Sequence, residues 1–384
     1  MTKKRILYLS GLGRPASIPF QEKLLHLGSR LSGDMVFSVS KGSSRPDLKE
    51  IGGFGLHQYS YVREGAISRN AYIFLMSMWY ALKIFYSGKR YQVIVSSTPF
   101  VTGLAAILLS RITGAKAIVE INGNFESAYK YDSKDGFGGR LLMRLKDRVS
   151  RSWISFVVRK ADGVKLVYHR QLEPLGIPAG AVKKVFSFAN FVPIGRFLQA
   201  EKSDGGYVLL LGYPWYLKGV DVLIKAFRKI SPEFPRLRLK VVGWCPSGRE
   251  FFEGLAGGDP RIELKDPVHY DDVIPLMCGC SLYVLASRTD SSPRVLREAM
   301  AAGKPIVASD IDGVPEIVRD GYNGLLFEKE NVDDLAQKMR KVLSRPEFAD
   351  ELARNGVRFV HEHLSEECYA KRFAEMIEDV TRGQ

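Results

Sequence analysis

The chain has 384 residues, of which 46% are hydrophobic and 26% are charged, a globular composition that excludes long disorder and gives enough chain for two domains with separate cores. The net charge of +14 is uneven, because residues 1–200 hold 30 Lys and Arg against 12 Asp and Glu (30 − 12 = +18), whereas residues 201–384 hold 26 against 30 (−4). This asymmetry indicates an anionic partner for the first half, which could be a membrane surface, nucleic acid or a phosphorylated substrate.

Targeting signals and cysteines point to the cytoplasm. The longest apolar run, which begins at Ala71, stops at Lys83 and is too short to span a bilayer. The first residues lead directly into a strand and turn, so we expect no signal peptide. The four cysteines show neither a secreted disulfide framework nor zinc spacing around Cys278 and Cys280. We therefore expect a cytoplasmic protein without a metal site.

The first half reads as an alternating α/β domain. Arg5–Gly13 predicts a strand that runs into a glycine turn at Gly11 and Gly13, followed by a helix, which is how a Rossmann-like unit opens. Residues 42–70 show little periodicity and are expected to form a long loop. Further strands are predicted at 35–40, 91–97, 115–121, 161–168 and 182–190, with helices at 71–86 and 100–114. Asn122-Gly123 follows the strand 115–121 at its carboxyl end, where it is either part of a site or only a turn.

A basic helix is predicted at 139–160. Arg140, Arg144, Arg148 and Arg151 recur at helical spacing, while apolar residues fall on the opposite side: Leu142, Leu145, Val149, Trp153 and Phe156. Two interpretations stay open. The apolar side packs on the sheet and the arginines are simply solvated, or the basic stripe docks the domain on an anionic membrane.

A second α/β domain begins after residue 197, where a polar, glycine-rich stretch follows Phe197. Residues 207–230 predict a strand, a loop and a helix, with Lys218-Gly219 at the helix start. A lysine is unfavourable beside the positive end of a helix unless an anion also binds there. Lys218 is therefore a candidate anion ligand.

Residues 281–309 read as strand, loop, helix and strand, which is one βαβ crossover of a parallel sheet. Its loop lies at the carboxyl end of the first strand, where ligands of such sheets bind. Ser292 is expected to cap the helix with Pro293 at its first position, so that the amides of Arg294 and Val295 face a diphosphate. Asp290 and Glu298 stand eight residues apart and can both bind one polyhydroxylated ligand. Alternatively, Asp290 caps the helix and Glu298 pairs with Arg294.

The stretch from Asp290 to Phe327, which continues after Asp290-Ser291 as SPRVLREAMAAGKPIVASDIDGVPEIVRDGYNGLLF, resembles the signature of glycosyltransferase family 4. The resemblance implies the GT-B fold: two Rossmann-like α/β/α domains facing a cleft, with a C-terminal helix that crosses back to the first domain. It assigns residues 1–197 with 366–384 to an acceptor-binding domain and 198–365 to a nucleotide-sugar-binding domain.

The same resemblance implies roles for residues of this chain. Asp290, where the family usually has Glu, would contact the donor sugar, and Glu298 would hold the ribose. Lys218 would bind the diphosphate, whereas Tyr213 stands where the family has an Arg, so that Arg294 or Arg288 would supply the missing charge. Asn122 replaces a family His and can bind a hydroxyl but cannot hold a proton charge. The candidate catalytic residues are thus Asp290, Lys218 and Asn122, and the candidate donor-binding residues are Glu298, Arg294, Ser291, Ser292, Val295, Tyr213, Gly212, Val268, Gly11 and Gly13.

The predicted function is that of a retaining, metal-independent glycosyltransferase. It would move a sugar from a nucleotide-diphosphate sugar, used as co-substrate without another cofactor, to a glycan or lipid-linked acceptor in surface polysaccharide or glycolipid synthesis. The expected partners are the nucleotide sugar, the acceptor and, if the basic stripe docks on a membrane, the anionic inner face of the cell membrane, with no nucleic acid. The alternatives are a binding protein that has lost turnover, motivated by Asn122, Tyr213 and Asp290, and another nucleotide-sugar enzyme of the same fold such as a 2-epimerase. An NAD-dependent oxidoreductase is disfavoured because no G-x-G-x-x-G follows the first strand.

Overall fold

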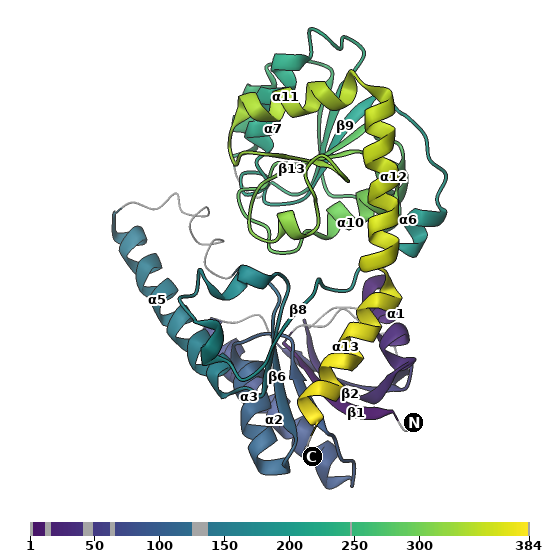
Figure 1. Cartoon of the computed structure of the whole chain (residues 1–384). Helices are drawn as coiled ribbons and strands as arrows, with labels where there is room; N and C mark the ends of the chain where they lie inside the picture. Colours follow the sequence, from purple (N-terminus) through teal and green to yellow (C-terminus); the bar gives the residue numbers. More distant parts are fainter. Residues whose placement is uncertain are drawn as a thin grey trace. The chain divides into compact units, whose positions relative to one another are not determined.

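The computed structural model describes residues 3–11, 17–40, 49–61, 66–124, 137–245 and 248–382, with the side chains of 18, 40, 61, 66–68, 137–146 and 179 left aside. The chain divides into two compact units (Figure 1). Unit 1 is built from the chain up to Gly123, from the segment that ends at Pro193, and from Glu366 onward, whereas unit 2 is built mainly from Ile194–Ser365. The division after Pro193 comes four residues before the expected boundary, which falls inside a short helix, α6 (Gly195–Gln199).

Unit 1 contains one sheet with the strand order β3-β4-β2-β1-β5-β6-β7-β8. Every neighbouring pair is parallel except β3 and β4. Parallel strands of this kind are covered on both faces and are accordingly rich in Val, Ile and Leu. The strands are β1 (Lys4–Ser10), β2 (Leu31–Ser40), β3 (Glu50–Ile51), β4 (Phe54–Tyr61), β5 (Val93–Ser96), β6 (Lys116–Ile121), β7 (Gly163–Leu166) and β8 (Val185–Ser187).

Strand β4 lies in the range expected to be a loop, so that expectation was wrong. The strand pairs with β2 along eight residues, from Gly33 opposite Phe54 to Ser40 opposite Tyr61. Its sequence, FGLHQYSY, mixes polar and apolar residues, and only Phe54 and Tyr59 are buried in the core. The pairing partner, rather than local hydrophobicity, makes this segment a strand.

Helices cover both faces of the sheet. One core includes residues of β1, β2, α1 and α13, and the other includes residues of β1, α2 and α3. The C-terminal helix α13 contributes Tyr369, Phe373 and Ile377 to the first of these cores, so the expectation that it packs on the first domain is confirmed. The helices of unit 1 are α1 (Ile18–Gly28), α2 (Ala66–Tyr86), α3 (Val101–Thr113), α5 (Phe137–Lys160) and α13 (Glu366–Thr381).

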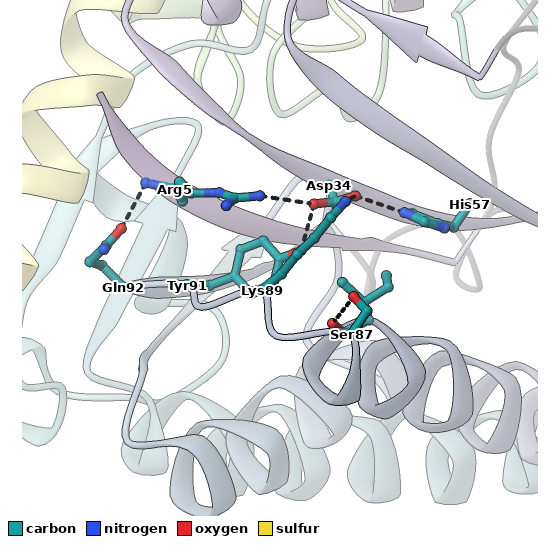
Figure 2. Close-up of polar contacts among 8 residues, drawn as sticks. Arg5, Asp34, His57, Ser87, Lys89, Tyr91 and Gln92 are labelled. Atoms are coloured by element: carbon teal, nitrogen blue, oxygen red, sulfur yellow. Dashed lines mark hydrogen bonds and ion pairs between the residues drawn. The ribbon is translucent and has the colours of Figure 1, made fainter. Parts of the chain in front are cut away.

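A buried carboxylate ties four segments of unit 1 together (Figure 2). The Asp34 side chain on β2 is fully buried and accepts a hydrogen bond from Lys89 at 2.8 Å, with the His57 ring at 2.7 Å. Tyr91 donates to its other oxygen, and an Arg5 nitrogen lies 3.8 Å away. Burial raises the pKa of Asp34, but the hydrogen bonds from His57, Lys89 and Tyr91 outweigh it and hold the pKa below its ordinary value.

We predict that Asp34→Asn destabilises the protein at neutral pH by about 1 to 2 kcal/mol, because it removes a buried charge whose cationic partners, Lys89, Arg5 and His57, are themselves partly exposed. A carboxylate with a lowered folded pKa contributes stability above its unfolded pKa of about 3.9, and this contribution is lost as the pH falls through the folded value. The difference between wild type and variant should therefore shrink below about pH 4. Urea unfolding at several pH values measures this, and a difference that stays constant with pH would contradict it.

Unit 2 repeats the architecture with the strand order β11-β10-β9-β12-β13-β14, all parallel. Its strands are β9 (Tyr207–Leu211), β10 (Arg238–Val242), β11 (Ile262–Lys265), β12 (Leu282–Leu285), β13 (Ile306–Ser309) and β14 (Leu325–Phe327). Its longer helices are α7 (Val220–Ile230), α8 (Arg249–Ala256), α9 (Tyr270–Cys278), α10 (Arg294–Ala301), α11 (Val332–Leu343) and α12 (Pro346–His363). The predicted crossover at 281–309 is confirmed as β12, α10 and β13. Among the described residues, no helix has the length and apolar character needed to cross a bilayer.

Candidate functional site

Two loops of unit 2 bring Lys218 and Asp290 together. Lys218 ends the loop after β9, and Asp290 lies in the loop after β12, which is the neighbouring strand. Because these strands are parallel, both loops leave the same edge of the sheet. Lys218 Nζ donates to Asp290 Oδ2 at 2.5 Å, and both side chains are mostly but not wholly buried. Two residues assigned separately to the diphosphate and to the sugar thus form one ion pair.

Glycine positions this pair. Gly219 has φ of 66°, and a Cβ there would lie 1.9 Å from the carbonyl oxygen of Ala286, so only glycine lets the start of α7 approach the end of β12 so closely. Gly212 has φ of 149°, and a Cβ there would lie 3.2 Å from the Lys218 side chain. The aliphatic part of Lys218 therefore packs against the backbone at Gly212.

Asp312, which the sequence analysis did not select, orients the Asp290 loop from the loop after β13. Its Oδ2 accepts hydrogen bonds from the Thr289 hydroxyl at 2.6 Å and from the Asp290 backbone N–H at 2.8 Å. Asp312 has φ of 45°, a left-handed conformation that is uncommon outside glycine, Asn and Asp. The available signal was the Asp312-Gly313 pair in the loop that follows the buried strand β13, because that pair is typical of a turn with positive φ.

Glu298 lies in the second turn of α10 and is fully buried. Its Oε1 accepts a hydrogen bond from the Tyr270 hydroxyl at 3.0 Å and lies 3.1 Å from Arg294 Nε, so the i, i+4 pair with Arg294 is present. Its Oε2 has no hydrogen-bond partner among the described residues. Burial raises the pKa of Glu298 although Arg294 and Tyr270 act in the opposite direction. Glu298 can therefore accept further hydrogen bonds from a ligand.

The start of α10 differs by one residue from the expected one. Pro293 is the N-cap and the helix begins at Arg294, so the prediction of Ser292 as the cap was wrong. Arg297, fully buried, instead donates to the Ser292 backbone and hydroxyl oxygens at 3.2 and 3.3 Å. Burial lowers the pKa of Arg297 to about 10. Ser291 and Val295, which flank this start, are half-buried.

Of the two arginines considered as a substitute for the missing family Arg, Arg288 is engaged elsewhere. Its buried guanidinium binds both oxygens of Asp221 at 2.8 Å and Glu330 at 2.7 Å, and lies 4.0 Å over the Tyr216 ring. Burial lowers the pKa of Arg288, but the two carboxylates outweigh it and raise the pKa above its ordinary value. Arg294, by contrast, has a side chain that is about half exposed. Of the two arginines, Arg294 is therefore the better placed to add positive charge beside Lys218.

Aromatic residues surround the same edge of the unit 2 sheet. Tyr213 follows β9, Trp244 follows β10, and both are more than half exposed, with their ring centroids 6.2 Å apart. Val268, one of the candidate donor-binding residues, is partly exposed between β11 and α9. A planar ligand could stack on these exposed rings.

Unit 1 contains a cavity of about 290 Å³ beside Asn122. The Asn122 amide donates to the Ser97 carbonyl oxygen at 2.9 Å and to Glu120 Oε2 at 3.0 Å, so that its Oδ1 is left as an acceptor with no partner among the described residues. Gly11 directly follows β1, and its carbonyl oxygen accepts a hydrogen bond from Ser38, whereas Gly13 lies outside the described residues. The cavity is lined by Tyr8, Ser10, Pro19, Phe20, Lys23, Leu24, Met35, Ser97, Asn122, Asn190 and Phe191.

A buried charge cluster supports the cavity, and the sequence analysis missed it. Glu120 on β6 accepts a hydrogen bond from the Tyr8 hydroxyl at 2.6 Å. Burial raises the pKa of Glu120, but Lys165 and Lys23 outweigh it and lower the pKa. Burial also lowers the pKa of Lys23, against the effect of Glu120. Apolar walls with a few polar groups are suited to a polyhydroxylated ring.

Helix α5 exposes three of the apolar residues that one interpretation packed on the sheet, while the side chains of Leu142 and Leu145 lie outside the described residues. Val149, Trp153 and Phe156 are exposed, and the buried face consists of Ile154, Val157 and Val158. Of the arginines, Arg148 is exposed and Arg151 pairs with Asp147 at 2.8 Å, while the side chains of Arg140 and Arg144 lie outside the description. The exposed side of α5 is therefore apolar as well as basic.

Comparisons with known proteins agree with this geometry. The family model of glycosyl transferases group 1 matches residues 205–345, which run from β9 to just after α11. An uncharacterized glycosyltransferase of Methanocaldococcus jannaschii is 33% identical over 46% of this chain and 49% of its own length. The chain spans about half the length of the curated relatives it matches.

Two solved structures resemble the whole chain. Sucrose-phosphate synthase from Thermosynechococcus elongatus has a TM-score of 0.80 at 16% identity, with both chains covered completely. The Anabaena protein HepE, in complex with UDP and glucose, has a TM-score of 0.72 at 16% identity over 97% of this chain and 99% of that one. The fold is therefore GT-B, as the resemblance implied.

Proposed function

We propose that this protein, whose residues 205–345 match the family model of glycosyl transferases group 1, transfers a sugar from a nucleotide-diphosphate sugar to an acceptor hydroxyl. The observation that carries the proposal is the Lys218–Asp290 pair near the start of α10, the helix that holds Glu298. The ammonium group of Lys218 can donate to a diphosphate, and the Asp290 carboxylate can accept from a sugar. The Glu298 carboxylate, with its unpartnered Oε2, can accept from a ribose.

The proposed transfer retains the configuration of the sugar. The bond from the anomeric carbon to the diphosphate oxygen breaks while a bond to the acceptor oxygen forms on the same face, and the leaving phosphate takes the acceptor's proton. Lys218, Arg294 and the first amides of α10 stabilise the charge that grows on the diphosphate. These protein groups let the reaction proceed without a metal ion. Asn122, which cannot hold a proton charge, would only orient a hydroxyl.

The acceptor is proposed to be a glycan or a lipid-linked saccharide of surface polysaccharide or glycolipid synthesis, bound in the cavity beside Asn122. The excess of positive charge in residues 1–200 and the exposed side of α5 support association with the anionic inner face of the cell membrane. Nucleic acid is not part of the proposal.

The donor can be identified by thermal stabilisation. We expect one nucleoside diphosphate and its sugar to raise the unfolding temperature selectively, because a ligand at a hundred times its Kd stabilises the folded state by about 2.7 kcal/mol. UDP and UDP-glucose are the first to test, since HepE was solved with UDP-glucose. Lys218→Ala should reduce the shift, whereas Lys225→Ala, an exposed lysine on α7, should not. If no nucleotide shifts the transition, the proposed donor site is wrong.

Measuring the release of nucleoside diphosphate distinguishes a transferase from the alternative functions. Release of nucleoside diphosphate only when an acceptor is present supports a transferase. Release without an acceptor indicates a hydrolysing enzyme such as a 2-epimerase, and binding without release under either condition indicates a binding protein.

A further inference from the structure

Helix α2 is apolar on two opposite faces. Its buried face consists of Ile73, Ser77, Ala81, Ile84 and Phe85, which pack in unit 1. Its outer face carries four large residues that lie at helical spacing and are exposed: Tyr72, Leu75, Trp79 and Tyr86. At 3.6 residues per turn, the centres of the two faces are roughly 180° apart. We call these four residues the outer face of α2.

The outer face is unusual for a helix at the surface of a folded unit. Such a helix normally presents polar residues to water, and an apolar outer side marks a surface that another body covers. Leu75 is 62% exposed, Trp79 is 52% exposed and Tyr86 is 89% exposed. Within the described part of the chain, nothing covers them.

The chain segment that carries this face has charges of one sign only. Residues 65–119, which span α2, β5 and α3, contain no Asp or Glu and six basic residues: Arg69, Lys83, Lys89, Arg90, Arg111 and Lys116. Lys89 is bound to Asp34, but Lys83, Arg90 and Arg111 are exposed. The Lys83 ammonium lies 5.2 Å over the Trp79 ring, at the edge of the apolar face. A partner that covers this face is therefore expected to carry negative charge.

We propose that the outer face of α2 docks on the surface of an anionic lipid bilayer. Trp and Tyr rings prefer the boundary between hydrocarbon and headgroups, and lysines and arginines beside them bind anionic headgroups. The face combines these two residue classes without an acidic group that would repel such a surface. An inserted apolar face accounts for the exposed Leu75 and Trp79, whereas a purely electrostatic partner such as RNA does not require them.

Helix α5 exposes further apolar residues of unit 1. Helix α3 packs against both α2 and α5 (Figure 1), and α5 exposes Val149, Trp153 and Phe156. The docking inference deepens the membrane association in the proposed function and rests on it. Docking is measured without sugar transfer, however, so that a failure of the docking inference can be distinguished from a failure of the proposed sugar transfer.

Co-sedimentation with vesicles tests the proposal on the full chain. The vesicles are phosphatidylcholine alone or with about one third phosphatidylglycerol, at low and high salt. We expect wild type to bind the anionic vesicles at low salt, and Leu75→Ser/Trp79→Ser to lower the partition coefficient at least tenfold, since two large side chains no longer enter the interface. The matched control is Phe251→Ser on α8 of unit 2, because Phe251 is as exposed as Trp79, at 52%.

Three results with vesicles would overturn the proposal. The first is that the wild-type protein does not bind anionic vesicles at low salt. The second is that the double variant binds as well as wild type, and the third is that Phe251→Ser loses as much binding as the double variant. A dimeric wild type that becomes monomeric in the double variant, by light scattering, would instead assign the face to a second copy of the chain. Nucleotide-induced thermal stabilisation of the double variant should equal that of wild type, which shows that the variant is folded.

Discussion

Glu298→Ala is expected to weaken binding of the donor nucleotide about a hundredfold, since losing a pair of charge-assisted hydrogen bonds removes roughly 3 kcal/mol. Glu298 is fully buried, and its Oε2 has no partner among the described residues. A ribose with two neighbouring hydroxyls could donate to this oxygen, so the expected loss falls on binding. Glu298→Gln keeps the shape but removes the charge and should lose about tenfold.

Isothermal titration with the donor nucleotide measures this prediction, and Glu351→Ala, an exposed carboxylate on α12, is the matched control. The pH dependence provides a second measurement. Burial raises the pKa of Glu298, so its carboxylate takes up a proton at a higher pH than an ordinary glutamate, whose pKa is about 4.3. As the pH is lowered, donor affinity should therefore begin to fall at a correspondingly higher pH. Normal affinity in both Glu298 variants would show that this residue does not hold the ribose.

Sequence reasoning located the crossover at 281–309 because its signals are local: an apolar strand, a polar loop, a helix with Pro and Gly at its ends, and another apolar strand. It did not foresee that Lys218 and Asp290 touch. That contact joins residues 72 positions apart and depends on β9 and β12 being neighbours in the sheet. Strand order is a property of the whole domain, so single-segment patterns do not contain it.

The missed elements have similar physical causes. Strand β4 has little apolar character of its own and is stabilised by its register with β2. Asp312 reaches the Asp290 loop from a left-handed backbone conformation. Residue type alone only indicates that such a conformation is possible. For α5, periodicity predicted a basic side opposite an apolar side, but helical spacing cannot say which side a neighbour covers. The structure buries Ile154, Val157 and Val158 and exposes Val149, Trp153 and Phe156.

Lys218→Ala is expected to lower the rate of sugar transfer by a factor of about 10² to 10³, or about 3 to 4 kcal/mol of barrier, with a smaller effect on donor affinity. The reason is that negative charge on the diphosphate grows as the bond to the sugar breaks, so the ammonium group stabilises the transition state more than the bound donor. Lys225→Ala, on the exposed side of α7, is the control.

The contact between Lys218 and Asp290 makes a sharper test possible. Residues in direct contact do not act independently, so Lys218→Ala combined with Asp290→Asn should cost clearly less than the sum of the two single changes. The reason is that Asp290, 2.5 Å from the ammonium group, holds Lys218 in place, and this part of its effect disappears once the lysine is gone. Steady-state kinetics of the four proteins gives the coupling. Additive losses would mean that the two residues work separately, and equal losses in rate and affinity for Lys218→Ala would reduce its role to anchoring the donor.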